Sequence, residues 1–184
     1  DVHHGNGTQH SFWKRADVLV FNIHQHPYYP GTGSPLLTGE GPGQGYNINV
    51  ALPAGCGDED YAAGFERLLV PIAEAYQPEM IVVSAGFDAH VRDPLAQMHV
   101  STEGFAALCG MVMDLAERLC EGRLALTLEG GYDLEGLSSS VRACVDVLSG
   151  SRKPPTVEAK AGRGAKALDR CQALLKPFWP TLPG

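Results

Sequence analysis

The sequence has 184 residues, of which 44% are hydrophobic and 19% are charged, and its formal net charge is −7. This length suits a single globular domain, and the composition excludes a disordered or fibrous chain. The acidic balance argues against direct binding of nucleic acid, and no apolar run approaches the ~20 residues that a membrane span needs.

The cysteines predict the cellular compartment of the chain, and its first residues indicate that it is a fragment. The five cysteines are scattered singly and form no C-x-x-C pair, so we expect free buried thiols in a reducing, cytoplasmic compartment. No signal peptide opens the chain. It starts at Asp1 without a methionine, so we expect a fragment whose upstream half is absent.

The first half of the chain predicts two strands separated by a long loop. Residues 18–23 form an apolar run that is typical of a buried strand. Residues 27–45 are rich in proline and glycine, which predicts a surface loop with a functional role. Residues 46–50 alternate between polar and apolar side chains and predict a short strand.

The middle of the chain alternates between helical and strand patterns. Residues 58–76 repeat apolar side chains at helical spacing after Asp58, a candidate N-cap. We further predict a buried strand over 80–84, a helix over 101–120 and a strand over 123–128.

The remaining segments complete an α/β pattern. We predict a helix over 134–148, a linker over 151–155 and a last helix over 158–175. Strands that alternate with helices indicate a parallel sheet with helices on both faces. We expect residues 1–150 to form the domain, and residues 151–184 to supply a linker and a helix that packs on or beside it.

Polar clusters follow the predicted strands, where ligands bind in parallel sheets. Asp1 and His3 alternate along an extended segment, so their side chains point the same way. Asp88 leaves the strand over 80–84 and can turn back towards them. Two carboxylates and an imidazole suit a divalent metal with an open position for water. The alternative is a strand-end carboxylate at Asp1 and a helix N-cap at Asp88.

Four motifs in this order resemble the histone deacetylase family, and its class II branch in particular. They are Asp-Val-His-His-Gly-Asn-Gly-Thr-Gln from residue 1, Pro-Gly-Thr-Gly from residue 30, Ser-Ala-Gly-Phe-Asp from residue 84 and Leu-Glu-Gly-Gly-Tyr from residue 128. The resemblance covers residues 1 to about 150 and looks most like a bacterial member. It implies an arginase-like α/β fold of which this chain is the C-terminal part, truncated at its N-terminus.

The resemblance also implies roles for individual residues. It implies three zinc ligands at Asp1, His3 and Asp88. Tyr132 matches the tyrosine that, together with the metal, stabilises the tetrahedral oxyanion. The resemblance places four residues beside the tunnel for the acylated side chain: Tyr29, Leu95, Gly130 and Gly131.

Two further roles follow from the resemblance. His4 is expected to make a supporting hydrogen bond. A structural potassium ion is expected near Asp1, His3, Asn22 and Ile23, with the asparagine in place of the family's serine.

The implied activity is zinc-assisted hydrolysis of acetyl-lysine amides in proteins. In the family, the general base is a pair of adjacent histidines upstream of the Asp-x-His motif, and this pair is absent from the chain. We therefore expect the chain alone to be inactive. One alternative is an acetylpolyamine amidohydrolase acting on small acetylated amines. The family's polyamine-selective members carry a glutamate where this chain has Leu95, which favours lysine.

A second alternative is a deacetylase-like module without catalysis, which folds and serves as a scaffold. Because missing upstream strands would leave part of the sheet unpaired, we expect the chain alone to be poorly stable or to associate with itself. The pattern leaves its oligomeric state open.

Overall fold

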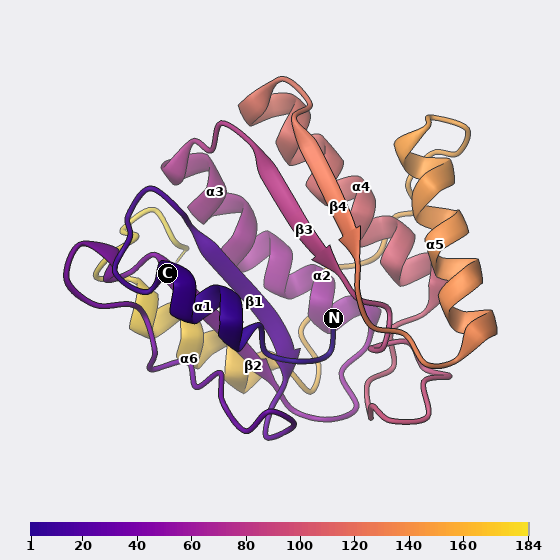
Figure 1. The fold of residues 1–184 in the computed structure, drawn as a ribbon, viewed down its shortest axis with the longest axis horizontal. Helices are drawn as coiled ribbons and strands as arrows, with labels where there is room; N and C mark the ends of the chain where they lie inside the picture. The colour runs from indigo at the N-terminus through magenta and orange to yellow at the C-terminus, as the bar shows by residue number, and fades with distance from the viewer. Residues whose placement is uncertain (184) are drawn as a thin grey trace.

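Two pairs of parallel strands form the centre of the molecule, whose computed structural model describes residues 1–183. β1 (Val20–Gln25) pairs with β2 (Asn47–Leu52), and β3 (Ile81–Ala85) pairs with β4 (Leu124–Leu128). The strands run in a common direction, so their carboxyl ends lie together, close to the N-terminus (Figure 1). All four predicted strands are present, with boundaries that differ by a few residues at most.

One long helical segment follows β2 and contains a wider turn than predicted. It consists of α2 (Asp58–Gly64), a π-helical turn η2 (Phe65–Leu69) and α3 (Val70–Tyr76). Pro71 explains the wide turn, because it has no N–H to donate and its ring crowds the carbonyl of the preceding turn. Gly57, rather than the predicted Asp58, is the residue before the helix.

Side-chain caps define the starts of the two longest helices, both of which were predicted. α4 (Thr102–Cys120) begins where the Ser101 hydroxyl accepts the N–H of Gly104 at 3.0 Å. α5 (Leu134–Leu148) begins where the Asp133 carboxylate accepts the N–H of Gly136 at 2.6 Å.

Three short elements differ from the predictions. α1 (Asn6–Phe12) was not predicted, and neither was the 3₁₀ turn η1 (Gly41–Gly43) within the expected loop. The predicted helix over 158–175 is wrong at its start, since α6 spans Ala165–Leu175. The Asp60 carboxylate accepts the N–H groups of Gly162 and Gly164 at 2.7 and 2.9 Å, which fixes the chain before α6 in a non-helical conformation.

The main hydrophobic core joins α6 to the β1–β2 pair. Ile48, Val50 and Leu52 of β2 are fully buried in the same cluster as Leu168 and Leu175 of α6. Figure 1 shows α1 in front of these strands and α6 behind them. Residues 165–175 therefore share the core of the preceding part of the chain, while the predicted division at residue 150 stays a prediction.

A second core lies between α4 and α5. It contains Phe87 together with residues from the buried faces of both helices, namely Ala106, Cys109, Ala143, Cys144 and Val147. All five cysteines of the chain are buried and none forms a disulfide.

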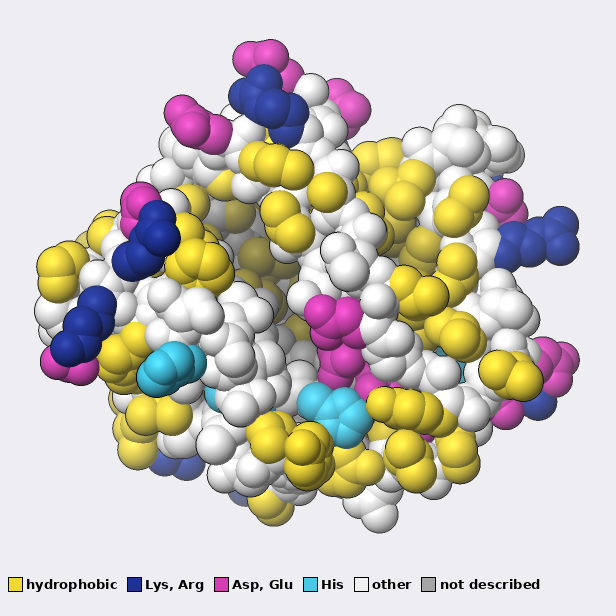
Figure 2. All heavy atoms as spheres, viewed as in Figure 1, with side chains coloured by type: hydrophobic (Ala, Val, Ile, Leu, Met, Phe, Trp, Pro, Cys, Tyr) yellow, Lys and Arg dark blue, Asp and Glu magenta, His cyan; other side chains and the backbone are white. Residues whose placement is uncertain are grey.

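The β3–β4 pair is covered on one face and open on the other. Ile81 and Val83 are partly buried, whereas Val82 is 67% exposed and Leu128 is 57% exposed. Figure 2 shows hydrophobic side chains over these strands and a hollow between them and β1. The parallel α/β class is confirmed, and within the described residues the second helical layer is present only over β1 and β2. None of the described helices combines the length and the hydrophobicity needed to cross a membrane.

Candidate metal centre

The first three residues lie between the carboxyl ends of the two strand pairs. The amino group of Asp1 donates a hydrogen bond to the carbonyl of Gly86, just after β3, at 3.0 Å. The N–H of Gln25, at the end of β1, donates to the carbonyl of Val2 at 3.0 Å. These two bonds hold residues 1–3 across the gap and direct the side chains of Asp1 and His3 towards the loop after β3.

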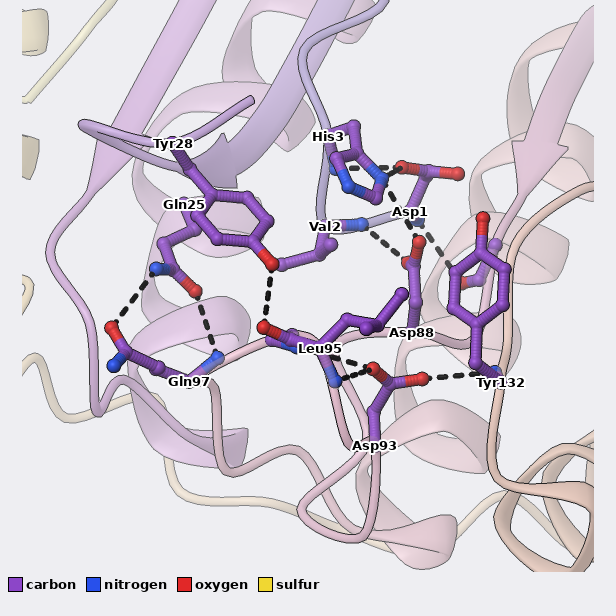
Figure 3. A network of polar contacts seen from close by, with 12 residues as sticks. Asp1, Val2, His3, Gln25, Tyr28, Asp88, Asp93, Leu95, Gln97 and Tyr132 are labelled. Atoms are coloured by element: carbon purple, nitrogen blue, oxygen red, sulfur yellow. Dashed lines mark hydrogen bonds and ion pairs between the residues drawn. The ribbon is translucent and has the colours of Figure 1, made fainter. Parts of the chain in front are cut away.

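Asp1, His3 and Asp88 bring together three atoms that could hold a metal ion, and the sequence predicted this proximity. His3 Nδ1 lies 3.1 Å from Asp1 Oδ1 and 3.0 Å from Asp88 Oδ2, and one such atom of each residue lies within 4.8 Å of the others (Figure 3). The three residues come from two segments that are 85 positions apart. Their meeting at the strand ends is a consequence of the parallel topology.

The two oxygens of the fully buried Asp88 carboxylate have different environments. Oδ1 accepts the N–H of Val2 at 2.6 Å. Oδ2 makes no hydrogen bond, although its distance to His3 Nδ1 falls within the range of an ion pair. A buried carboxylate oxygen without a hydrogen bond is costly. A divalent cation between Asp88, His3 and Asp1 would satisfy it, so the donor set fits a metal.

Two glycines leave the space that these carboxylates occupy. A Cβ on Gly86 would lie 2.5 Å from Asp1 Oδ2, and a Cβ on Gly130 would lie 2.3 Å from Asp88 Oδ2. Both distances are far below van der Waals contact. Gly130 thus packs directly against the Asp88 carboxylate. Its position beside the substrate tunnel stays a prediction.

Tyr132 leaves the loop after β4 on the same side as the metal cluster. Its side chain is 54% exposed, and its hydroxyl points in the direction of the Asp1 carboxylate (Figure 3). Gly131 precedes it with a φ of 141°, a conformation that few other residues adopt. The N–H of Tyr132 donates to Asp93 Oδ2 at 2.9 Å.

Two adjacent tyrosines surround His3, of which sequence reasoning singled out only one. The ring of Tyr28 stacks on His3 with centroids 5.4 Å apart, and its hydroxyl donates to the carbonyl of Leu95 at 2.5 Å. Tyr29 meets His3 edge-on at 5.8 Å and is 75% exposed. The side chain of Leu95 is 53% exposed. The Tyr-Tyr pair in a proline-rich loop was the available signal, but it does not tell which ring covers the histidine.

His4 faces away from the metal cluster and into a second group of histidines. Its Nδ1 lies 2.7 Å from Thr32 Oγ1 and its Nε2 lies 3.0 Å from Gln9 Oε1. Its ring centroid lies 5.1 Å from that of His24, which is fully buried. Burial lowers the pKa of His4, and burial together with His4 lowers the pKa of His24 to about 3. His4 therefore supports the loop around Thr32.

Two of the four residues expected at a potassium site, Asn22 and Ile23, give it no support from their side chains. Asn22 Oδ1 accepts the N–H of Gly5 at 3.1 Å, whereas Asn22 Nδ2 is buried without a partner. The unpaired atom is a donor, which cannot bind a cation. Ile23 packs against the main core. The potassium ion stays a prediction from the resemblance alone.

Comparisons with known proteins place the chain in a family. A model of the histone deacetylase domain matches residues 1–148. Histone deacetylase 5 from Arabidopsis thaliana is 41% identical over 99% of this chain, which covers 28% of that protein. A histone deacetylase-like amidohydrolase from Pseudomonas aeruginosa is 42% identical over 83% of this chain, which covers 40% of that protein.

A solved structure agrees with the fold. The crystal structure of the HDA15 HD domain is 38% identical and superposes with a TM-score of 0.88, covering 99% of this chain and 50% of that one. The chain thus spans half or less of each of these three relatives. Since the family model matches residues 1–148 of the 184, the chain belongs to the histone deacetylase family.

Proposed function

We propose that this chain supplies the metal-binding and oxyanion-stabilising part of a zinc-dependent deacetylase that acts on acetyl-lysine in proteins. The observation that carries the proposal is the buried Asp88 Oδ2, which lacks a hydrogen bond and lies 3.0 Å from His3 Nδ1 beside Asp1. Membership in the histone deacetylase family supports the reaction class.

The donor set favours zinc with a catalytic arrangement. Three protein ligands of oxygen and nitrogen leave one position open for water or substrate, as catalytic zinc sites do. When bound, zinc supplies Lewis-acid polarisation of the acetyl carbonyl and makes water more acidic. Asp1 and Asp88 balance the charge of a divalent cation. His3 is held by the stacked ring of Tyr28, so that Nδ1 faces both carboxylates.

Tyr132 is assigned to the developing oxyanion. Its phenol is a hydrogen-bond donor, and its ring leaves the loop after β4 on the side of the carboxylates. A donor placed where negative charge develops stabilises the transition state more than the ground state. The hydroxyl of Tyr132 is therefore expected to contribute to turnover more than to substrate affinity.

The general base that transfers the proton is assigned to the full-length protein and not to these 184 residues. The resemblance places the general base in a pair of histidines upstream of the Asp-x-His motif, outside the 184 residues. His4 does not replace it, because both of its ring nitrogens are engaged, with Thr32 and Gln9. We expect the chain alone to bind zinc without turning over substrate.

The exposed residues near the metal cluster favour a lysine side chain. Tyr29 offers apolar surface beside His3, and the exposed Leu95 lies next to Tyr28, which suits the aliphatic stem of lysine. Leu95 cannot pair with the second cationic nitrogen of an acetylated polyamine. Acetyl-lysine is therefore the proposed substrate, and an acetylpolyamine is the alternative outcome of the test.

The test compares the full-length, zinc-loaded protein with its Tyr132→Phe variant on an acetyl-lysine peptide. Loss of one oxyanion donor is expected to lower kcat by about 10²–10³, with little change in KM. Tyr76→Phe is the matched control, because Tyr76 ends α3 and packs against Tyr46. The same kcat in Tyr132→Phe and wild type would remove Tyr132 from the mechanism.

The wild-type protein separates the remaining alternatives. Hydrolysis that stops on chelation and returns with zinc supports a metal-dependent deacetylase. Hydrolysis of acetylated spermidine in preference to the peptide would replace the substrate assignment. A folded, zinc-loaded protein that hydrolyses neither substrate would refute the proposed function and favour a scaffold.

A further inference from the structure

Asp93 lies between the metal-binding segment and the loop that carries Tyr132. It is 8% exposed, and its two carboxylate oxygens have separate partners. Oδ1 accepts the N–H groups of Leu95 and Ala96 at 2.9 and 3.1 Å and so closes a turn over Pro94. Oδ2 accepts the N–H of Tyr132, 39 residues further along the chain, at 2.9 Å (Figure 3).

We propose that Asp93 is a positioning residue that holds Tyr132 in its catalytic orientation. The inference rests on the proposed function, because it acts through the Tyr132 hydroxyl. The backbone of Tyr132 needs such an anchor, since Gly130 and Gly131 precede it and glycine restricts φ and ψ least. A bond from its own N–H to a nearly buried carboxylate is charge-assisted and short, and it fixes the Cα from which the ring extends.

A second link between the same two segments is exposed. Arg92 pairs with Asp133 at 3.1 Å and with Glu135 at 2.6 Å, and the side chain of Arg92 is 52% exposed. Water and salt screen such pairs, so they hold a loop less firmly than a buried bond does. Of these two side-chain links, the one from Asp93 therefore constrains Tyr132 more strongly.

The turn closed by Asp93 also fixes the far side of the metal cluster. The carbonyl of Leu95 accepts the hydroxyl of Tyr28, whose ring stacks on His3. The N–H of Gln97 donates to Gln25 Oε1 at 3.0 Å, which ties the same segment to the end of β1. Substitution of Asp93 must therefore separate its effect on Tyr132 from its effect on this turn.

The substitution Asp93→Asn distinguishes the effect on Tyr132 from the effect on the turn. In Asp93→Asn the remaining oxygen still accepts the N–H groups of Leu95 and Ala96, while the new amide group opposes the N–H of Tyr132. In the full-length, zinc-loaded protein we expect kcat to fall about tenfold or more, since small displacements of a catalytic group are costly. We expect KM and the zinc content to stay within about twofold, because the metal ligands and the turn are retained.

A double-mutant cycle tests whether Asp93 acts through Tyr132. In a Tyr132→Phe background, Asp93→Asn is expected to change kcat less than about twofold. An equal loss in both backgrounds would overturn the proposal. Glu135→Gln is the matched control, since it removes a charge from the exposed link between the same segments, and it is expected to leave kcat within about twofold.

A measurement independent of activity keeps the two proposals distinguishable. Amide hydrogen exchange of residues 129–133 is expected to accelerate at least about tenfold in Asp93→Asn and not in Glu135→Gln. Unchanged exchange would overturn the inference even if the wild-type protein proved inactive. If Asp93→Asn fails to fold, Asp93→Ser repeats both measurements, because its hydroxyl accepts N–H groups in the turn and is too short to reach Tyr132.

Discussion

Burial of His24 predicts that its imidazole contributes to destabilisation of the fold in moderate acid. His24 is fully buried, and its Nε2 lies 3.1 Å from the carbonyl of Gly33, which it meets as a donor in its neutral form. Its Nδ1 is buried without a partner. Protonation would place a positive charge in this site, next to His4 and without a carboxylate to balance it. Burial therefore lowers the pKa of His24 from 6.5 to about 3.

The sign and the size of the effect follow from this pKa. Because the pKa in the folded state lies below that of the unfolded chain, the unfolded state binds the proton first as the pH falls. Stability linked to His24 is complete above pH 6.5 and is lost as the pH falls from there towards about 3. Between pH 8 and pH 5 the free energy of unfolding falls by about 2 kcal/mol on this account.

The assay is urea unfolding of the protein and its His24→Gln variant at pH 8 and pH 5. Glutamine keeps an N–H for the Gly33 carbonyl but does not titrate. Between the two pH values, the variant is expected to lose about 2 kcal/mol less stability than the wild type. His10→Gln, at an exposed histidine, is expected to follow the wild type. Equal losses in wild type and His24→Gln would refute the assignment of a depressed pKa to His24.

Two further predictions concern the metal site and the open strand face. Gly130→Ala is expected to weaken zinc binding about 10–100-fold, measured in competition with a chelator, because the new Cβ displaces Asp88. Gly7→Ala is the control, since a Cβ at Gly7 meets nothing within 4 Å. The chain alone is expected to associate through the exposed β3–β4 face, and Val82→Glu is expected to shift it towards monomer in sedimentation velocity. A monomeric wild-type chain would contradict the second prediction.

The strands and long helices could be predicted because their signals are local. Apolar runs mark the strands, and Ser101 and Asp133 cap helices within one turn of their own positions. α1 has no cap and no fully buried residue, and it depends on distant partners: Gln9 accepts hydrogen bonds from Asn47 and Asn49. The start of α6 was missed for the same reason, since its limit is set by a carboxylate about 100 residues earlier.

The proximity of Asp1, His3 and Asp88 could be predicted from the sequence, whereas the residues that support them could not. Asp1, His3 and Asp88 were singled out by the motifs that resemble the histone deacetylase family, and their positions after predicted parallel strands indicated that they could meet. Tyr28 and Asp93 could not, because their roles depend on bonds to Leu95 and Tyr132 that span 67 and 39 residues. A single sequence carries no signal for such pairings until the fold has brought them together.

Because a hollow separates the two strand pairs, a cation held by Asp1, His3 and Asp88 would link one pair to the other. Asp1 and His3 belong to a segment bonded to the end of β1, while Asp88 follows β3. A motion that pulls residues 1–3 away from the loop after β3 would break the bonds of Asp1 to Gly86 and of Val2 to Asp88 and would separate His3 from Asp88, so a bound cation opposes that motion. By thermodynamic linkage, whatever holds the strand pairs together raises the affinity for the cation by the same factor. The affinity for the cation and the relative motion of the two strand pairs are therefore coupled.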